Sequence, residues 1–371
     1  MKRKLPSMKW LQHIVRLTFV LSLLVGCVAP TVQPAFAPTA PPAQLSVSTP
    51  SGAPQASGRV DGLSEQDAAT LDSLKKVDDY PLYTMRYSGS YDRRASSDSI
   101  HRLASASMPL TWACSLFAAL GDANNMLYGR NFDWEQSPAV LLFTSPPDRY
   151  ASVSMVDIAY LGFGGSKAAT LTELPLIERQ ALLNAPFLPF DGMNERGLAV
   201  GMAAVPPSDM KSDPNKETID SLRVIRKMLD QASSVDEAVA ILQRYNIELG
   251  GGPPLHYLIA DRSGRAMLVE FYQGKMVLML NDRPWHQATN FLRSAVGENA
   301  QGQCWRYDTI FRQLTQAGGR LLAQEASSLL ADVSQEGTQW SIVYEMNTGD
   351  VKVSMGRRYG NVHTFHLDLV K

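Results

Sequence analysis

The sequence lacks an excess of charge of either sign. Its 35 lysines and arginines nearly balance its 36 aspartates and glutamates, and the formal net charge is −1 at pH 7. Nucleic-acid-binding domains carry a basic excess because they neutralise phosphates, and solvating tails carry long runs of like charge. Neither pattern is present, so we expect no nucleic-acid partner.

Cysteine is scarce, and the usual metal-binding patterns are missing. The chain has three cysteines, none in a CxxC pair, and its six histidines form no HExxH pattern. Zinc sites depend on such closely spaced ligands, so we predict no metal and no cofactor. A framework of several disulfides is excluded as well. One bond between Cys114 and Cys304 and a free Cys114 thiol both remain open.

The N-terminus contains an export pattern. The apolar run LTFVLSLLVGC follows five basic residues, Lys2, Arg3, Lys4, Lys9 and Arg16. A basic segment before a short apolar stretch is typical of a signal peptide, and this run is too short for a stop-transfer helix. It ends in Leu24-Val25-Gly26-Cys27, which resembles a bacterial lipobox. We expect residues 1–27 to be a lipoprotein signal peptide and the exported protein to be lipid-anchored to the bacterial cell membrane at Cys27. An uncleaved anchor is the alternative.

Residues 28–62 have the composition of a linker. Pro, Ala, Ser and Thr dominate, and large apolar residues are too few to form a core. Ordered sequence begins near Leu63, with a short helical pattern and then the strand-like DYPLYTMRYSGSYD. A polar stretch, RRASSDSIHRLASASM, leads from there to Cys114.

After Cys114 the chain alternates between hairpin and helix patterns. CSLFAAL and NMLYGRNF flank a turn rich in Gly, Asp and Asn, and LPFDGMNERGLAVGMAAV predicts a second hairpin. Apolar residues recur at helical spacing over 219–242 and over 307–333, and strand patterns lie between and after these segments. Blocks of hairpins separated by helix pairs predict an α+β fold in which helices cover two stacked antiparallel sheets.

Polar residues gather at the edges of these predicted hairpins and at two later positions: Cys114, Arg130, Asp133, Asn194, Asn290 and Arg306. The segments that carry them, ACSLFAAL, GRNFDW, DGMNERGL, ATNF and CWRYD, resemble the motif set of the choloylglycine hydrolase (linear amide C–N hydrolase) family. That family includes bile salt hydrolases, penicillin V acylases and acid-ceramidase relatives. The resemblance covers residues 114–371. It implies an N-terminal nucleophile hydrolase with a four-layer αββα sandwich that acts on small-molecule N-acyl amides.

The residue types suit this chemistry. A cysteine at the N-terminus of a chain has its own base, because the neighbouring α-amine has a reference pKa of about 7.7 to 8.0. We expect Arg130, on the adjacent strand, to favour the thiolate and Asp133 to accept a hydrogen bond from the α-amine. Asn194, at its turn, is expected to donate to the oxyanion. By the resemblance, Asn290 and Arg306 complete the polar wall of the site.

Each of these residues also has a structural interpretation. Cys114 alone suits a buried thiol, Arg130 and Asp133 suit a plain ion pair, and Asn194 suits a left-handed turn position. Cys304 is expected to pack rather than react. Four large aromatic residues either line an acyl pocket or belong to the core: Trp134, Phe143, Tyr160 and Phe163.

The position of Cys114 imposes a requirement. The simplest members of the family place the cysteine directly after the initiator methionine, whereas 113 residues precede Cys114 here. Cleavage between Ala113 and Cys114 must therefore release the α-amine. Residues 63–113 resemble the propeptide of the acid-ceramidase-like members, which cleave themselves. We expect autoproteolysis, followed by amide hydrolysis through an acyl-cysteine intermediate.

Two other functions remain open. The first is an acyltransferase that uses the same site to pass the acyl group to an amine. The second is a non-catalytic binding lipoprotein with the same fold, an uncut chain and an unreactive Cys114. A serine α/β-hydrolase is disfavoured, because the GxSxG motif of its nucleophile elbow is absent. The acyl substrate and the oligomeric state do not follow from the sequence.

Overall fold

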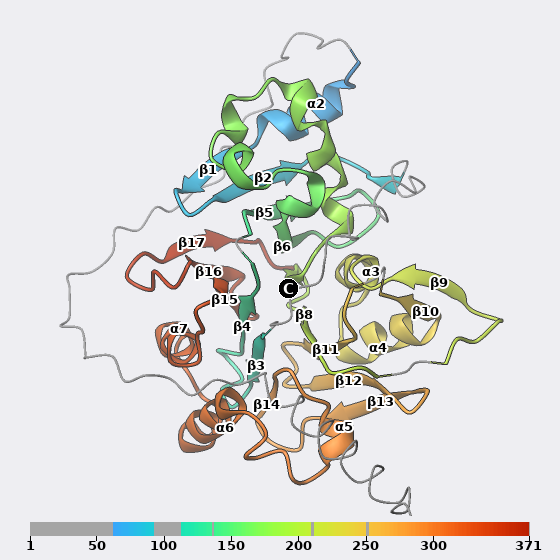
Figure 1. The fold of residues 1–371 in the computed structure, drawn as a ribbon, viewed down its shortest axis with the longest axis vertical. Helices are drawn as coiled ribbons and strands as arrows, with labels where there is room; N and C mark the ends of the chain where they lie inside the picture. The colour runs from blue at the N-terminus through green and yellow to red at the C-terminus, as the bar shows by residue number, and fades with distance from the viewer. Residues whose placement is uncertain (1–61, 93–112, 136, 209–210, 250–251, 371) are drawn as a thin grey trace, which may run out of the picture.

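The computed structural model describes residues 62–92, 113–135, 137–208, 211–249 and 252–370 (Figure 1). The predicted signal peptide, all but the last residue of the predicted linker, and residues 93–112 of the predicted propeptide lie outside the described residues. Within the described ranges, no helix combines the length and the apolar character needed to cross a bilayer.

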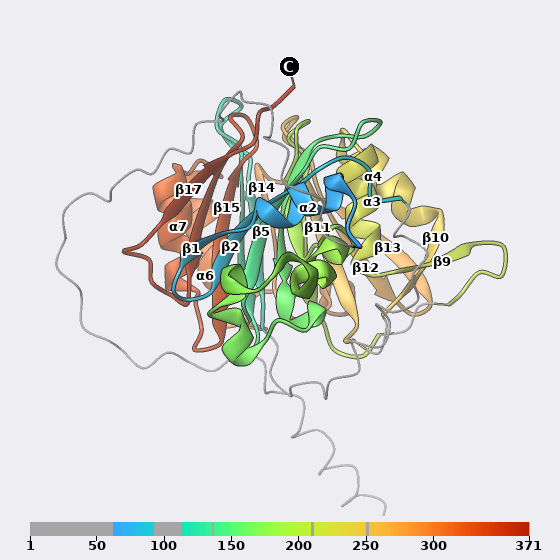
Figure 2. The same cartoon turned by 90° about the horizontal axis from the view of Figure 1, so that it is seen from above.

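Two β-sheets stack face to face at the centre of the fold (Figures 1 and 2). The larger sheet has nine strands, in the order β1 (Lys75–Asp78), β2 (Leu82–Tyr87), β5 (Ala139–Thr144), β6 (Ser152–Asp157), β7 (Asp191–Asn194), β8 (Ala199–Ala204), β11 (Leu255–Ala260), β12 (Ala266–Tyr272) and β13 (Lys275–Leu280). The smaller sheet has six, in the order β14 (Trp285–Ala288), β3 (Ser115–Ala119), β4 (Leu127–Asp133), β15 (Thr338–Glu345), β16 (Asp350–Met355) and β17 (His363–His366). Neighbouring strands of both sheets are antiparallel, except that β2 runs parallel to β5.

Helix pairs cover the outer faces of the two sheets, as Figure 1 shows. The pair on the nine-stranded sheet is α3 (Arg223–Gln231) and α4 (Val235–Gln243), and the pair on the six-stranded sheet is α6 (Trp305–Ala317) and α7 (Ala323–Asp332). Each helix turns an apolar side to its sheet, as amphipathic helices do; Ile225 and Leu229 of α3 are fully buried. The predicted α+β fold with four αββα layers is confirmed.

The remaining elements lie around this sandwich. They are α2 (Glu65–Asp72), α5 (Arg293–Val296), the 3-10 helices η3 (Ile158–Leu161), η4 (Gly165–Ala168), η5 (Leu171–Glu173) and η6 (Leu176–Phe187), and a parallel pair of strands, β9 (Glu217–Asp220) and β10 (Tyr245–Glu248). Helical spacing predicts a helix that includes Ile219, but this residue lies in β9. The Asp220 side chain accepts the N–H of Leu222 at 2.8 Å, which ends the strand and starts the turn into α3.

The described part of the predicted propeptide is built into the larger sheet. β2 lies between β1 and β5, and its Leu82, Tyr83 and Met85 side chains are fully buried. The Tyr83 hydroxyl donates to the carbonyl of Ala168 at 2.6 Å. Since burying a large apolar side chain contributes about 1.5–3 kcal/mol, residues 62–92 are an integral part of the fold.

A glycine allows the two sheets to approach each other near Cys114. A Cβ atom on Gly201 of β8 would lie 2.8 Å from the Tyr128 hydroxyl and 2.9 Å from Cδ2 of Leu116. Both distances are shorter than real Cβ contacts, so a larger residue at position 201 would force the buried Tyr128 or Leu116 side chain to shift. Glycine therefore suits the close approach of β8 to the hairpin that carries the candidate site.

Candidate active site

Cys114 lies directly before β3, where the two sheets face each other, and it is 4% exposed. The β3–β4 hairpin pairs Leu116 with Arg130 and Ser115 with Asn131, so the predicted return of GRNFD beside the cysteine is confirmed. One guanidinium nitrogen of Arg130, Nη2, donates to the Cys114 sulfur at 3.8 Å. Cys114 is a free thiol, which excludes the disulfide with Cys304 that the sequence left open.

The surroundings of the thiol favour its protonated form. Burial raises the pKa of the Cys114 thiol, and the negative charge of Asp133 acts in the same direction. The positive charge of Arg130 and the hydrogen bonds from Arg130 and from the main chain of Asp133 lower that pKa, but they do not outweigh burial. A neutral thiol at neutral pH needs a base to become a nucleophile.

Arg130 is completely buried and is held at its other end by the nine-stranded sheet. Its Nη1 atom forms an ion pair with Asp191 of β7 and donates to the carbonyl of Phe190 at 2.7 Å. The guanidinium lies 4.9 Å from the centre of the Phe132 ring, which adds a cation–π contact. Asp191 is not among the residues predicted for the site, although a charged residue in the apolar arm LPFDGM is a signal for it.

Asn290 and Arg306 hold the main chain of Cys114. The Cys114 N–H donates to Oδ1 of Asn290 at 2.7 Å, and Nη2 of Arg306 donates to the same oxygen at 2.9 Å. Nη1 of Arg306 donates to the Cys114 carbonyl at 2.5 Å and to the Ser115 hydroxyl at 2.9 Å. Arg306 occupies the first turn of α6, and its side chain is fully buried against β3. The two residues therefore lie beside the cysteine, where the resemblance places them.

Asp133 has different partners from those predicted. Its carboxylate accepts hydrogen bonds from the Thr338 hydroxyl at 2.5 Å and from the Gln335 amide at 2.8 Å, and Nη1 of Arg306 lies 3.9 Å away. The nitrogen of Cys114, which is an amide in the continuous chain, donates to Asn290 instead. Burial raises the pKa of Asp133, while the charge of Arg306 opposes that shift.

Asn194 does not face the cysteine. Its two side-chain N–H groups donate to the carbonyls of Leu229, at 3.0 Å, and Ala232, at 2.7 Å, and its oxygen accepts from the main chain of Arg196 and Leu198. Successive strand residues alternate between faces, so Asn194 points to α3 while Asp191, three residues earlier, points between the sheets. This geometry contradicts the predicted role as oxyanion donor. Asn194 closes its turn and ties it to the end of α3.

Comparison with known proteins relates this site to a family. Residues 114–293 match the model for linear amide C–N hydrolases of the choloylglycine hydrolase family, and the match begins at Cys114. The match covers slightly less than half of the chain, and over this segment the protein is similar to that family. This similarity supports hydrolysis of linear amide C–N bonds. Five of the six candidate residues fall within the match, and Arg306 lies beyond it.

One solved structure supports the fold, and a second is reported for comparison. A mutant of the conjugated bile acid hydrolase from Clostridium perfringens aligns over 69% of this chain and 92% of its own, with 16% identity and a TM-score of 0.50. A penicillin V acylase from Agrobacterium tumefaciens aligns over 70% of this chain and 88% of its own, with 17% identity and a TM-score of 0.47. At such low identity the first of these shows the fold alone.

An aromatic cluster lies next to Arg130. The Phe132 ring stacks on Trp340, with centroids 4.0 Å apart, and contacts the ring of Phe190 at 5.2 Å. Trp134 lies 6.1 Å from Phe132, and Tyr160 lies 5.5 Å from Phe190. Two of the four large aromatic residues that the sequence left open between pocket and core, Trp134 and Tyr160, are thus half-buried members of a cluster beside the site.

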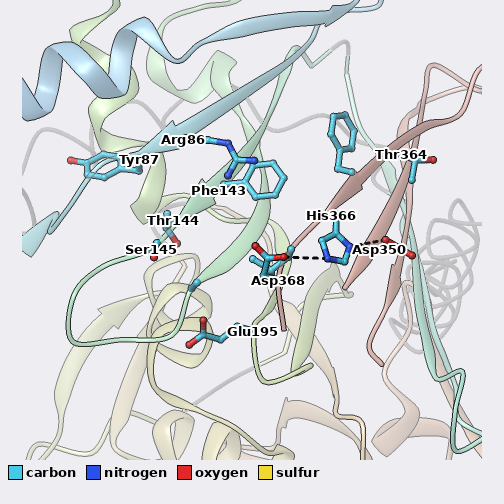
Figure 3. Close-up of a pocket in the computed structure, with 13 residues that line it drawn as sticks. Arg86, Tyr87, Phe143, Thr144, Ser145, Glu195, Asp350, Thr364, His366 and Asp368 are labelled. Atoms are coloured by element: carbon cyan, nitrogen blue, oxygen red, sulfur yellow. Dashed lines mark hydrogen bonds and ion pairs between the residues drawn. The ribbon is translucent and has the colours of Figure 1, made fainter. Parts of the chain in front are cut away.

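The other two of these aromatic residues lie elsewhere. Phe163 is buried in the core, and Phe143 lines a separate cleft of about 640 Å³ between β5 and β17 (Figure 3). Among the polar groups of that cleft, His366 pairs with Asp350 at 2.8 Å and with Asp368 at 3.5 Å. Its lining includes none of the six candidate residues. Within the described ranges, no group of three or more His, Cys, Asp or Glu side chains is arranged to hold a metal ion.

Proposed function

We propose that the protein hydrolyses small-molecule N-acyl amides with Cys114 as an N-terminal nucleophile. One observation carries this proposal: three side chains from different elements converge on a single cysteine. Arg130 contacts its sulfur, Asn290 its nitrogen and Arg306 its carbonyl. The family match that begins at Cys114 supports the same residue as the start of the catalytic domain.

Release of the α-amine supplies the base that the buried thiol needs. Once the bond between Ala113 and Cys114 is cut, the Cys114 nitrogen becomes a primary amine with a pKa near pH 8. Asn290 accepts a hydrogen bond from that nitrogen, which leaves the amine lone pair available to take the thiol proton. The resulting thiolate lies beside the positive charge of Arg130.

Asn290 replaces Asn194 as the proposed oxyanion donor. Nδ2 of Asn290 donates one N–H to the carbonyl of Ala204 at 2.7 Å, and a side-chain amide carries two. The second N–H is available for the oxygen of a substrate amide attacked by the adjacent sulfur. Such a donor is worth about 3–4 kcal/mol of transition-state stabilisation.

The remaining steps follow from the same groups. Attack by the thiolate forms a C–S bond, and the tetrahedral intermediate collapses as its C–N bond breaks. The α-ammonium returns its proton to the leaving amine, which gives an acyl-cysteine. Water, deprotonated by the α-amine, then cleaves the thioester and restores the thiol. The aromatic cluster around Phe132 and Trp134 suits an apolar acyl group.

Maturation is proposed to use the same cysteine. The sulfur attacks the Ala113 carbonyl, which moves the upstream chain from nitrogen to sulfur, and water hydrolyses that thioester. We also propose that residues 1–27 direct export and that Cys27 carries a lipid, since the basic and apolar leader ends in LVGC.

The test of the proposed function combines processing and turnover. Intact mass and N-terminal sequencing of purified wild type should give a chain that begins at Cys114. A panel of N-acyl amides should then yield acid and amine in equal amounts, and acid quenching should trap an acyl adduct on the Cys114 peptide. Cys114→Ala should stay uncut and inactive. Amide hydrolysis by an uncut wild-type chain, or by Cys114→Ala, would exclude this mechanism.

A further inference from the structure

Asp191 is a buried carboxylate that has no role in the proposed mechanism. It lies in β7 of the nine-stranded sheet and is completely inaccessible to solvent. Besides the ion pair with Arg130, it accepts hydrogen bonds from the Tyr344 hydroxyl at 2.5 Å and from the Trp340 indole at 3.2 Å. Tyr344 and Trp340 belong to β15 of the opposite sheet. Three donors from that sheet thus fix one carboxylate.

Arg130 connects this carboxylate to the nucleophile. Its Nη1 faces Asp191, and its Nη2 faces the Cys114 sulfur. The same cation therefore serves two groups, the Asp191 carboxylate and the Cys114 thiol, and the thiol becomes charged only when it loses its proton.

The charges around Cys114 are balanced while its thiol is neutral. Arg130 pairs with Asp191, and Arg306 lies 3.9 Å from Asp133. All four side chains are almost completely buried. Loss of the thiol proton to solvent would place a third negative charge among two cations in a region of low dielectric, which is unfavourable.

We propose that Asp191 is a positioning residue that shares Arg130 with the Cys114 sulfur and thereby keeps the thiol protonated until the α-amine takes its proton. This inference rests on the proposed function, because it assigns Asp191 a purpose in that reaction. A purely structural ion pair would stabilise the sheets without any effect on the acidity of Cys114. The acidity of the thiol therefore separates the two roles.

The test is Asp191→Asn in the full chain, with the ionisation of Cys114 as the readout. Asparagine keeps the shape of the side chain, and it can accept from Arg130 and Trp340 while its amide faces the Tyr344 oxygen. Arg130 then has the sulfur as its remaining anionic partner. The rate of iodoacetamide labelling, followed on the Cys114 peptide by mass spectrometry, should reach half its maximum at a pH about one unit lower than in wild type.

Asp157→Asn is the matched control. Asp157 is a buried carboxylate of the same sheet, in β6, and it accepts from the main chain of Ala159 at 2.9 Å. Its loss should leave the labelling midpoint of Cys114 unchanged. Samples are compared in the same processed state, established by intact mass. An Asp191→Asn midpoint equal to that of wild type, or higher, would overturn the proposal.

A second variant keeps the proposal testable if Asp191→Asn does not fold. Tyr344→Phe removes one donor from the Asp191 carboxylate, which then interacts more strongly with Arg130 and leaves less of its charge for the sulfur. The labelling midpoint should rise, and an unchanged or lower value would overturn the proposal. Labelling needs no amide substrate. Absence of amidase activity in wild type would therefore refute the proposed function. The labelling midpoints would still decide whether Asp191 controls the acidity of the Cys114 thiol.

Discussion

Alanine substitutions at Asn290 and Asn194 test directly which side-chain amide donates a hydrogen bond to the oxyanion. Asn290 touches the Cys114 nitrogen, whereas Asn194 has all its hydrogen-bonding groups engaged by main-chain atoms of its own turn and of α3. Substitution of each by alanine should therefore separate turnover from stability. The two variants remove the same side chain, from a buried strand position at Asn194 and from a half-buried loop position at Asn290, so each is the control for the other.

The expected magnitudes follow from the contacts. Asn290→Ala removes the proposed oxyanion donor, and kcat should fall by about 10²- to 10³-fold, equivalent to about 3–4 kcal/mol. Asn194→Ala leaves two buried carbonyls and two main-chain N–H groups without partners. Each such group costs about 1–3 kcal/mol, so the loss of stability is about 3 kcal/mol or more and the melting temperature should fall by roughly 6–10 °C.

The assay measures amide turnover at a temperature where both variants are folded, together with thermal unfolding by circular dichroism. Rates are compared on chains with Cys114 at the N-terminus, as judged by intact mass. Turnover by Asn290→Ala within threefold of wild type would remove Asn290 from the mechanism. A hundredfold loss in Asn194→Ala with an unchanged melting temperature would restore the sequence-based assignment.

Three further predictions address anchoring, processing and pH. Cys27→Ala should move the protein from the membrane fraction to the soluble fraction after lysis, and retention equal to wild type would contradict the lipobox. After cleavage before Cys114, residues 62–92 should stay bound through β2, so both pieces should co-elute in gel filtration and separate only in denaturant; separation in native buffer would contradict this. Burial raises the pKa of the Cys114 thiol in the folded protein above the unfolded value of about 8.5. The contribution of this shift to the free energy of unfolding is fully present below the unfolded pKa, and it is lost as the pH rises through the folded pKa. The unfolding free energy from urea titration should therefore fall more steeply above pH 8 in wild type than in Cys114→Ala, and parallel profiles would exclude this linkage.

Local pairing explains which parts of the site the sequence could predict. The turn between the two arms of the first hairpin sets its register, and this alone brings Arg130 beside Cys114. Asn290 and Arg306 are far from Cys114 in the chain, and only the family resemblance placed them there. Arg306 reaches the cysteine because α6 packs its first turn against β3, a contact that periodicity does not reveal.

Strand faces and strand order explain what the sequence could not predict. DGMNERGL contains two polar residues on opposite faces of β7, and the motif does not tell which of them points between the sheets. Asp191 does so, and Asn194 does not. Likewise, the pairing of β2 with β5 joins segments separated by the whole β3–β4 hairpin, and no local pattern encodes this parallel contact.

The balance of charge around Cys114 also explains why the proposed enzyme would need its cleavage. Transfer of the thiol proton to a free α-amine gives a thiolate and an ammonium side by side, so the net charge of the buried site does not change. Loss of the same proton to solvent adds a charge to a site in which Arg130 and Arg306 are already compensated by Asp191 and Asp133. The continuous chain has no such amine, and its thiol stays a weak nucleophile. Weak reactivity suffices for maturation, which happens once in each chain, whereas repeated turnover requires the base that maturation releases.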